Sequence, residues 1–458
     1  MGLEQVKAEI SKFAKNTSST TQSVWDMYFF EHFLYRIAKS EYISNFVFKG
    51  GFLLETILGI QTRSTTDIDL KSMKLDLSND ELEKIFKYIA SIDLLDDITY
   101  EVTNVSDIKK ESKYKGKTIR VSAKYYNIRK SFSVDVATGD TVTPNPIKLL
   151  YSSKINDLQF KILAYSNETI LAEKFETLVS RGLNNSRAKD LLDIYLLVNV
   201  GYDEFIFNAA IINTFYTRGT RLDKENLDVV EDVLSSERIK ELFEHYCKRH
   251  SFSKNITFEE CKKSVRSLLA SIHLYEKVNL DQNQITLIRH GQDERNKLGG
   301  WSDNKLTDEG IKEVVILSKE LSEKYDLIIS SDLPRAFETA KIISEYLGLE
   351  LILDPEFRET NNGLLKNLTL EEFNIKYPGL YFSTLKMDQR YPNGESPNDF
   401  YNRIKEAFIK IINEYQNKNI LIVTHGGVIT VINCLINGWE YSNLLKITIP
   451  TATTLKLK

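Results

Sequence analysis

The sequence predicts two domains: an α+β N-terminal half, in which a sheet is followed by a helical subdomain, and an α/β C-terminal half with a three-layer, mainly parallel sheet. The chain has 458 residues, more than one hydrophobic core usually organises. Helical periodicity dominates from Asn167, and regular alternation of strands and helices begins near Gln284. A polar segment, EKVNLDQNQ, separates the two patterns. We therefore expect domains at 1–277 and 284–458, joined by a linker at 278–283.

The composition is that of a globular protein, with 42% hydrophobic and 27% charged residues. The net charge of -4 gives no global basic field, so a nucleic-acid partner would need a local basic patch. Three cysteines argue against a disulfide framework. No apolar run is long enough to span a bilayer and the N-terminal segment lacks a signal-peptide pattern, so we expect a cytoplasmic protein without a membrane partner. The oligomeric state stays open.

The N-terminal half begins with mixed patterns and then becomes helical. Apolar spacing predicts a helix at 24–38, and short apolar or alternating runs predict strands at 45–48, near Ile68 and at 131–136. The helical subdomain is predicted from helices at 169–179, 188–197, 227–234 and 258–275.

In the C-terminal half, predicted strands alternate with predicted helices. The strands are expected at 285–288, 327–330, 351–353 and 420–423, and the helices at 308–324, 336–347 and 401–415. Active sites of such sheets lie beyond the carboxyl ends of the strands, here at 289–292 and 424–427. Both loops contain a histidine before glycine, in LIRHG and IVTHGG. A lone histidine at a strand end is usually structural, but two in matching contexts indicate a site.

This half resembles the histidine phosphatase superfamily, also called phosphoglycerate-mutase-like, from about Gln284 to the end. The resemblance rests on RHGQDERN, LTDEG, SSDLPRAFETA, FRETNNG, PNGES and THGG, in that order. It implies His290 as the nucleophile that becomes phosphorylated and Glu359 as the acid and base. Phosphate binding is implied for Arg289, Arg335 and His425, with substrate contacts from Asn296 and Gly426.

No cofactor is implied for this half, and its partner would be a phosphorylated substrate. Positioned cationic donors and an in-line nucleophile are what phosphoryl transfer requires. The absence of an ERHYG-type element at the acid favours hydrolysis over mutase activity. The stretch Leu364–Met387 is expected to be a variable lid that selects the leaving group.

In the first half, Asp67 and Asp69 alternate along a predicted strand and therefore face the same side, where two carboxylates can hold a divalent metal. Asp135 is a candidate third carboxylate. The Gly50–Gly51 backbone can approach a triphosphate closely. A Gly-Gly turn followed by Asp-x-Asp has about an even chance of being an unrelated loop and a solvated strand.

These residues look like the nucleotidyltransferase fold, and closest to the AbiEii/AbiGii toxin family within it. Beyond GG and RSTTDIDL, the segment ILAEKFETLVSRGLNNSRAKDLLDIYLL resembles that family's later helices. The resemblance implies Mg²⁺ on Asp67, Asp69 and Asp135, and an incoming NTP near Gly50, Gly51, Arg63 and Thr65. Lys174 would contact its phosphates and Asp190 would orient tRNA or another acceptor. An exposed helical ion-pair face is the competing interpretation, most of all for Arg187, Lys189 and Asp193.

The leading hypothesis is a bifunctional enzyme of a toxin or phage-defence system: a metal-independent phosphatase joined to a Mg²⁺-dependent nucleotidyltransferase that acts on RNA or tRNA. In a second reading, the phosphatase regulates the transferase as a built-in antitoxin. In a third, the first half is a catalytically inactive binding module that targets or regulates the phosphatase. For His245, Cys247 and His250, a helix-end cluster is favoured over a zinc site.

Overall fold

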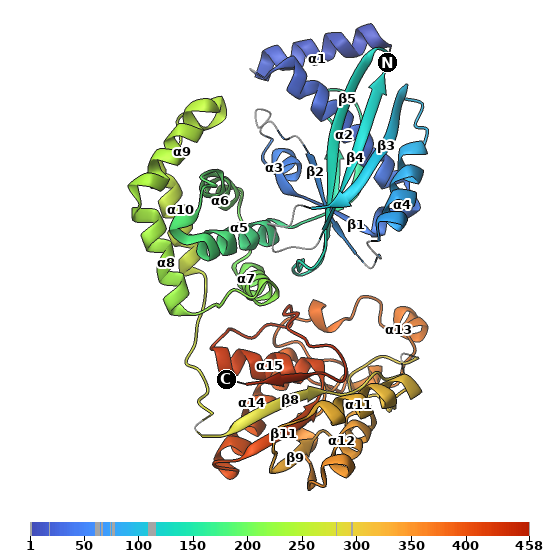
Figure 1. The fold of residues 1–458 in the computed structure, drawn as a ribbon, viewed down its shortest axis with the longest axis vertical. Coiled ribbons are helices and arrows are strands. Elements are labelled where there is room, and N and C mark those ends of the chain that lie inside the picture. The colour runs from blue at the N-terminus through green and yellow to red at the C-terminus, as the bar shows by residue number, and fades with distance from the viewer. Residues whose placement is uncertain are drawn as a thin grey trace. The chain divides into compact units, whose positions relative to one another are not determined.

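The computed structural model describes residues 2–17, 19–59, 65, 67–73, 75, 78–108, 116–280, 282–294 and 296–457. The chain divides into two compact units, Met1–Ile272 and His273–Lys458 (Figure 1). This division lies upstream of the 278–283 linker expected from the sequence. The reason is that the segment after Ile272 is bonded to the second unit: Tyr275 N donates to Gly438 O at 2.7 Å, and Val278 N donates to Leu435 O at 2.9 Å.

A seven-stranded mixed sheet with the order β3-β4-β5-β2-β1-β7-β6 organises the first unit. The strands are β1 (Phe46–Lys49), β2 (Asp67–Ser72), β3 (Ile98–Asp107), β4 (Gly116–Tyr125), β5 (Ile128–Ala137), β6 (Ile147–Ser152) and β7 (Gln159–Ala164). The pairs β1–β7 and β2–β5 are parallel, and the other neighbours are antiparallel. The strands expected at 45–48, near Ile68 and at 131–136 correspond to β1, β2 and β5.

Helices α1 (Leu3–Thr17), α2 (Thr21–Lys39), α3 (Gly50–Leu58) and α4 (Asn79–Ser91) accompany this sheet. The α2 helix begins at the N-cap Thr20, whose side chain accepts a hydrogen bond from Ser23 N. Its aromatic side chains Phe29, Phe30 and Phe33 are fully buried, as its apolar spacing predicts. The Gly-Gly pair that follows β1 opens α3.

The helical subdomain consists of α5 (Asn167–Arg181), α6 (Lys189–Val200), α7 (Glu204–Arg218), α8 (Lys224–Ser235), α9 (Glu237–Arg249) and α10 (Phe258–Ala270). It confirms the α+β class with a helical subdomain. The α10 helix is shorter than the 258–275 expected from its periodicity, because the chain leaves the helix at Ser271 and runs on to the second unit.

The second unit is a three-layer α/β structure whose five-stranded sheet has the order β10-β9-β11-β8-β12. Four strands run parallel, and β12 is an antiparallel edge. The strands are β8 (Gln284–Arg289), β9 (Leu327–Ser330), β10 (Leu351–Leu353), β11 (Asn419–Thr424) and β12 (Thr454–Lys456). Every predicted strand of this half is present, and β12 was not predicted.

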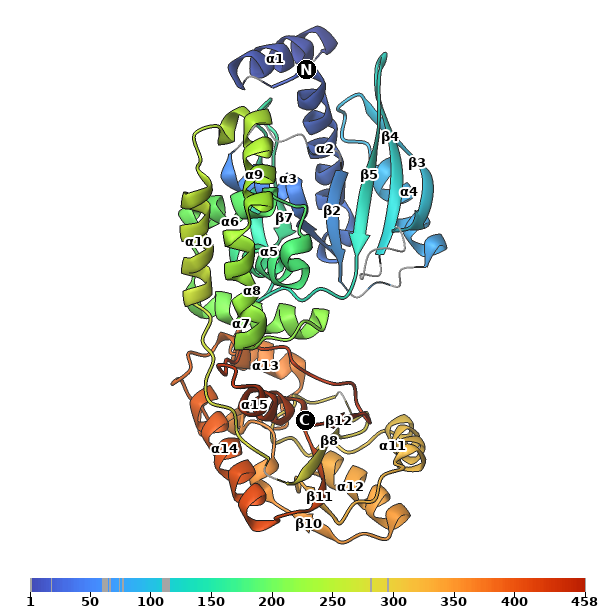
Figure 2. The ribbon, with the colours of Figure 1, turned by 60° about the vertical axis from the view of Figure 1, so that its left-hand side comes forward.

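Helices cover both faces of this sheet (Figures 1 and 2). Helices α11 (Asp308–Glu320) and α12 (Pro334–Leu347) contact each other on one face, and α14 (Pro397–Glu414) and α15 (Gly426–Asn437) contact each other on the other. A short helix, α13 (Leu370–Lys376), lies in the insertion between β10 and α14. The main core includes Ile288, Val314, Ile343 and Val423. In the part of the chain that the structure describes, no helix is long and apolar enough to cross a membrane.

Arg36 fastens α2 to the start of β3. Its guanidinium donates to both oxygens of Asp96 at 2.8 and 2.7 Å and to Ile98 O at 2.9 Å, and the side chain is 1% exposed. Burial alone would raise the pKa of Asp96, but hydrogen bonds from His32 and Arg36 lower it below its usual value.

We predict that Arg36→Ala lowers the free energy of unfolding of the first unit by about 3–5 kcal/mol, because it leaves Asp96 charged, half-buried and short of partners. Urea unfolding of the full-length protein, followed by circular dichroism, measures this loss. The matched control is Arg266→Ala, which breaks an exposed arginine–carboxylate pair with Glu231 and should have no measurable effect. Equal losses in the two variants would contradict the role given to Arg36.

Candidate functional site

A cavity of about 520 Å³ lies in the second unit at the carboxyl ends of β8 and β11. Its lining includes the residues expected from the histidine motifs: Arg289, His290, Arg335, Glu359 and Gly426. The N-termini of α12 and α15 reach the same place, and helix N-termini favour anions. The position agrees with the rule that ligands of parallel sheets bind beyond the strand ends.

His290 follows β8 and is 5% exposed. Its Nδ1 lies 2.8 Å from Gly291 O, an acceptor, so Nδ1 bears the proton and Nε2 keeps a lone pair. Arg335 Nε donates to this Nε2 at 3.3 Å. Burial, reinforced by the neighbouring Arg335, lowers the pKa of His290 to about 3. The ring is therefore neutral at ordinary pH.

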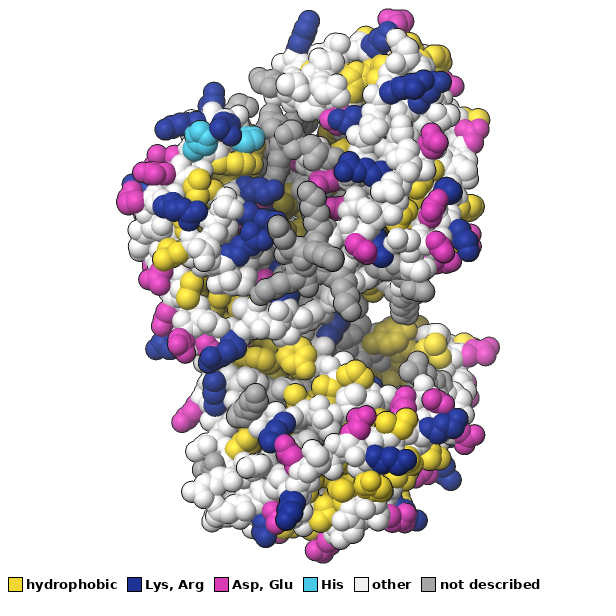
Figure 3. Space-filling view, viewed as in Figure 1, with side chains coloured by type: hydrophobic (Ala, Val, Ile, Leu, Met, Phe, Trp, Pro, Cys, Tyr) yellow, Lys and Arg dark blue, Asp and Glu magenta, His cyan; other side chains and the backbone are white. Residues whose placement is uncertain are grey.

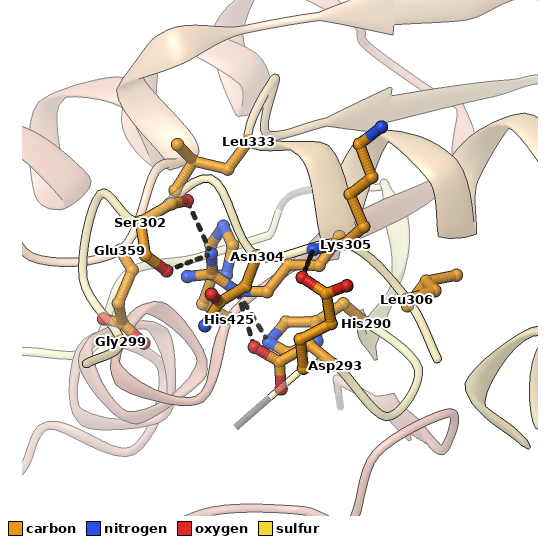
Figure 4. Close-up of polar contacts among 12 residues, drawn as sticks. His290, Asp293, Gly299, Ser302, Asn304, Lys305, Leu306, Leu333, Glu359 and His425 are labelled. Atoms are coloured by element: carbon orange, nitrogen blue, oxygen red, sulfur yellow. Dashed lines mark hydrogen bonds and ion pairs between the residues drawn. The ribbon is translucent and has the colours of Figure 1, made fainter. Parts of the chain in front are cut away.

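His425 follows β11, and its ring centroid lies 5.2 Å from that of His290. Its Nε2 is 2.9 Å from Ser331 Oγ, whereas its Nδ1 is buried and has no hydrogen-bond partner among the described residues. Burial, followed by the charge of Arg335, lowers the pKa of His425 well below its usual value. A neutral imidazole with an unused ring nitrogen faces the same region as His290 (Figure 4).

The two arginines are held differently. Arg335, 2% exposed at the start of α12, donates through Nη2 to Gly300 O at 2.8 Å and through Nη1 to Ser302 O at 3.3 Å. Arg289 Nη1 donates to Ile449 O at 2.9 Å, and its Nε is buried without a partner in the described part of the chain. An unsatisfied donor of this kind is costly unless a ligand accepts from it.

Glu359 lies opposite the N-terminus of α15. Its Oε2 accepts from Gly427 N at 3.0 Å and its Oε1 from Thr360 N at 3.1 Å. A Cβ on Gly427 would fall 2.3 Å from the Glu359 carboxylate, so only glycine permits this approach. Two residues that sequence reasoning did not single out hold the Glu359 carbonyl: Trp301 Nε1 donates to it at 2.7 Å and Arg403 Nη2 at 3.2 Å.

Asn296, expected to contact substrate, is exposed and is not among the residues that line the cavity. Asn304, which the sequence reasoning missed, lines the cavity and is 1% exposed. The motif around RHG gives the position of Asn296 along the chain but not the path of the following loop. That loop returns at Ser302 and Asn304, close to Arg335.

The insertion expected to be a lid, Leu364–Met387, contributes Leu365, Phe373 and Leu385 to a small separate core that also includes Tyr391. Phe382 of this insertion lines the cavity. Asn443 Nδ2 ties it to the loop before β12 by donating to Phe382 O at 2.7 Å and to Leu385 O at 2.9 Å. The insertion therefore forms one wall of the cavity.

In the first unit, β2 places Asp67 and Asp69 on one face of the sheet, as alternation predicts. Asp69 is the direct partner of Asp135 on the parallel neighbour β5. Burial, then the charge of Asp135, raises the pKa of Asp67; burial, then the charge of Asp67, raises the pKa of Asp69 to about 6. Carboxylates whose pKa is raised in this way attract a cation, so Asp67 and Asp69 have the chemistry of divalent-metal ligands.

Two further observations concern a metal ion at these acids. Asp135 Oδ1 accepts from Thr118 Oγ1 at 2.7 Å, so one of its oxygens is already engaged. As placed, no group of three or more His, Cys, Asp or Glu side chains in the described residues is arranged to hold a metal ion. This includes His245, Cys247 and His250 at the end of α9, where His250 Nδ1 lies 2.9 Å from Tyr246 O.

The Gly-Gly pair lies directly against the acids. Gly50 has a φ of +76°, and a Cβ there would fall 1.9 Å from Asp69 Oδ2. Thr65 is nearby, since its Oγ1 would be 3.1 Å from a Cβ on Gly51 and donates to Glu55 Oε1 at 2.7 Å. Arg63, also expected near the NTP, lies outside the described residues.

Lys174 on α5 is brought together with Asp190 and Asp193 on α6. Its Nζ lies 2.9 Å from Asp190 Oδ1 and 2.5 Å from Asp193 Oδ2. Both acids are buried, at 3% and 1% exposed, so an exposed ion-pair face is wrong for them. Lys189 is close enough to Asp67 to oppose the rise in its pKa. Arg187 N donates to Asn185 Oδ1 at 2.8 Å, which orders the turn before α6.

A second charged cluster, not predicted, adjoins the acids. Lys49 is the cross-strand partner of Asp69, and its Nζ lies 2.8 Å from Asp140 and 3.2 Å from Glu173. Arg218 on α7 joins the cluster through Asp140 at 3.2 Å. Burial acts to lower the pKa of Lys49, but Glu173 and Asp140 raise it well above its usual value. Lys49 therefore stays protonated beside Asp69, and the acids that pair with it balance its charge.

Comparison with known proteins gives two family matches. The model of the histidine phosphatase superfamily (branch 1) matches residues 285–458. The model described as nucleotidyl transferase AbiEii toxin, Type IV TA system, matches residues 32–266.

Individual proteins resemble the C-terminal half. Phosphoglycerate mutase-like protein 4 of Arabidopsis thaliana is 35% identical over 164 residues, which are 34% of this chain and 71% of that protein. Phosphoserine phosphatase 1 of Hydrogenobacter thermophilus is 29% identical over 165 residues, 35% of this chain and 78% of that protein. The solved structure of the alpha-ribazole phosphatase from Shigella flexneri is 27% identical, with a TM-score of 0.35, and covers 38% of this chain and 89% of its own.

The parallel sheet with its paired histidines and the mixed sheet with its paired aspartates thus each match a family model. The chain belongs to the AbiEii family of nucleotidyl transferases through its N-terminal half and to the histidine phosphatase superfamily through its C-terminal half.

Proposed function

We propose that the chain is a bifunctional enzyme: its second unit hydrolyses phosphate monoesters through a phosphohistidine, without a metal, and its first unit transfers a nucleotide from an NTP with Mg²⁺. The first claim rests on one observation above all. Arg289 Nε is a buried donor and His425 Nδ1 is a buried ring nitrogen, and neither has a partner in the described residues. Arg289 lines the same cavity as His290, and the His425 ring centroid lies 5.2 Å from that of His290. A phosphoryl group supplies the acceptor that Arg289 Nε lacks, and it accepts from His425 in the tautomer that carries the proton on Nδ1.

In the proposed hydrolysis, the lone pair of His290 Nε2 attacks phosphorus and the bond from phosphorus to the leaving oxygen breaks. Glu359, as the general acid, donates a proton to that oxygen. A water then attacks the phosphohistidine, Glu359 takes a proton from it, and inorganic phosphate leaves. Arg289, Arg335 and His425 stabilise the charge on the equatorial oxygens throughout.

In the proposed transfer, Asp67 and Asp69, with the free oxygen of Asp135, would hold Mg²⁺. The ion would neutralise the triphosphate and polarise its α-phosphorus. The Gly50–Gly51 backbone would lie along the triphosphate, and Asp190 would orient the acceptor hydroxyl. The oxygen of that hydroxyl would attack the α-phosphorus, its proton would pass to solvent, and pyrophosphate would leave. Lys174, held by Asp190 and Asp193, would contact the phosphates from the helical subdomain.

An RNA acceptor, such as tRNA, is supported by the charge of the helical subdomain. Lys and Arg side chains gather over its helices on the face drawn in Figure 3, and Lys248 and Arg249 occupy the last turn of α9. Local positive charge is what a polyanion requires when the whole chain is acidic. The description of the matched family as a toxin supports a place in a toxin or phage-defence system.

For the hydrolase, we predict that His290→Ala lowers kcat for p-nitrophenyl phosphate by more than about 10³-fold, because the nucleophile is lost. Glu359→Gln should accumulate phosphohistidine, since nitrophenolate leaves without an acid while water is no longer activated. Acid-labile, base-stable label from ³²P-substrate measures the intermediate. His273→Ala, at an exposed histidine, should behave as wild type. Label that persists in His290→Ala would refute the mechanism.

The depressed pKa of His290 predicts a pH-dependent stability. Between its ordinary value of 6.5 and about 3, the unfolded chain binds a proton that the folded chain does not, so unfolding becomes easier as pH falls. His290→Gln should remove up to about 1.4 kcal/mol per pH unit of this slope. Calorimetry of the full-length protein in phosphate-free buffer at pH 7 and pH 5 measures it. A slope no flatter than that of His273→Gln would contradict the buried neutral state.

For the transferase, we predict that Asp67→Asn with Asp69→Asn abolishes the transfer of label from α-³²P-NTPs to bulk tRNA in the presence of Mg²⁺, because the metal loses its ligands. Phosphatase activity should be unchanged, which shows that the second unit folds, and a wild-type circular dichroism spectrum should show that the substituted first unit folds as well. Asp228→Asn, at an exposed acid on α8, is the matched control. Transfer that survives the double substitution would remove this half of the proposal. Calorimetry that detects no NTP binding to wild type would favour a binding module instead.

A further inference from the structure

Asn304 is an unexplained polar residue of the phosphatase cavity. The side chain lies among those around His290 and His425 (Figure 4) and lines the cavity. It is 1% exposed, and its Oδ1 has no hydrogen-bond partner within the described part of the chain. Its Nδ2 donates to Lys297 O at 3.5 Å, which is at the limit of hydrogen-bond length. The proposed hydrolysis gives this residue no role.

A buried amide oxygen without a partner costs free energy, and folded proteins rarely tolerate one without a reason. Here the oxygen borders a cavity, so a bound ligand can supply the missing donor. The direction of the Nδ2 contact toward a carbonyl is consistent with Oδ1 as the free atom.

The loop that bears Asn304 is fixed by the catalytic residues themselves. Arg335 donates to Gly300 O at 2.8 Å and to Ser302 O at 3.3 Å. Trp301 Nε1 donates to Glu359 O at 2.7 Å. The position of Asn304 is therefore fixed relative to Arg335 and Glu359. A residue that discriminates between substrates needs such a fixed position.

The chemistry of Oδ1 decides which part of the ester it meets. An amide oxygen repels the ionised oxygens of the phosphoryl group, which Arg289, Arg335 and His425 already serve. It attracts a hydrogen-bond donor, which the leaving group can provide. Asp293 and Glu294, further acceptors, line the cavity from the same segment of chain. Although Lys297 also lies there, this segment offers acceptors to the leaving group.

We propose that Asn304 is a specificity-determining residue, and that the preferred substrates are phosphate monoesters whose leaving group bears a hydroxyl or ammonium donor. The inference rests on the proposed phosphatase function and narrows its substrate class. A site with an acceptor for a substrate hydroxyl rejects the analogue that lacks it, because the buried acceptor then stays unpaired.

The test compares full-length wild type with Asn304→Leu, which is similar in size but has no polar atom. The esters are propyl phosphate, which has no donor, glycerol 3-phosphate, which has hydroxyls, and phosphoethanolamine, which has an ammonium. Wild type should have the higher kcat/KM on one or both donor-bearing esters. Asn304→Leu should lose about tenfold on the preferred ester and nothing on propyl phosphate. Asn398→Leu, at an exposed asparagine of α14, should match wild type.

Asn304→Asp guards against a merely structural effect, because it keeps the acceptor. It should retain the preference for a donor-bearing ester and favour phosphoethanolamine more than wild type does. An equal loss on all three esters in Asn304→Leu would overturn the proposal, since Asn304 would then serve the phosphoryl group or the fold. No loss on any ester would also overturn it. If wild type hydrolyses neither these esters nor p-nitrophenyl phosphate, the phosphatase function itself fails, and this inference with it.

Discussion

The register between β8 and β11 is the constraint on which the phosphatase site depends. The two strands run parallel with Arg289 opposite Thr424, so the residues that follow them, His290 and His425, leave the sheet at the same height. The strand pairing alone therefore brings the two rings close together. A slip of one residue would turn every side chain of one strand to the opposite face and separate the two imidazoles. The buried apolar side chains of both strands hold the register in place.

In the first unit, a pair of parallel strands likewise brings site residues together, but these residues are acidic. There, β2 and β5 are parallel neighbours, and Asp69 is the direct partner of Asp135. In the second unit the guanidiniums of Arg289 and Arg335, which attract an anion, lie beside the two imidazoles. In the first unit the neighbouring groups are carboxylates, and each disfavours the charge of the next. The second unit thus attracts anions and the first attracts cations, although the functions proposed here make both units act on phosphate groups.

Much of this could be predicted from the sequence, and the exceptions have physical causes. Strand ends followed by His-Gly, and alternation at Asp67 and Asp69, predict positions that the backbone alone determines. Asn304 and Arg403 could not be found in this way, because a loop path and a helix face bring them to the site from non-contiguous segments. Asn296 is the opposite case: the motif predicted it as a site residue, but it does not line the cavity. A motif gives the position of a residue in the sequence and not its position in space. Lys174 with Asp193 was ambiguous because helical spacing does not reveal which face a neighbouring helix covers.

The division between the compact units, at Ile272 and His273, lies upstream of the linker expected at 278–283. Polar composition marks 278–283 as linker-like, yet the residues just before it are bonded to the second unit through backbone groups that composition cannot register. Side-chain composition alone does not distinguish a flexible linker from a segment whose backbone is hydrogen-bonded to a domain.

The small separate core of Leu365, Phe373, Leu385 and Tyr391 has a consequence for how this enzyme changes over evolutionary time. Because the insertion packs largely on itself, mutations within it need not disturb the sheet that aligns the reacting groups. The catalytic residues and the cavity wall that contacts the leaving group can therefore diverge at different rates. The same reaction can then act on new substrates through mutations in the insertion alone.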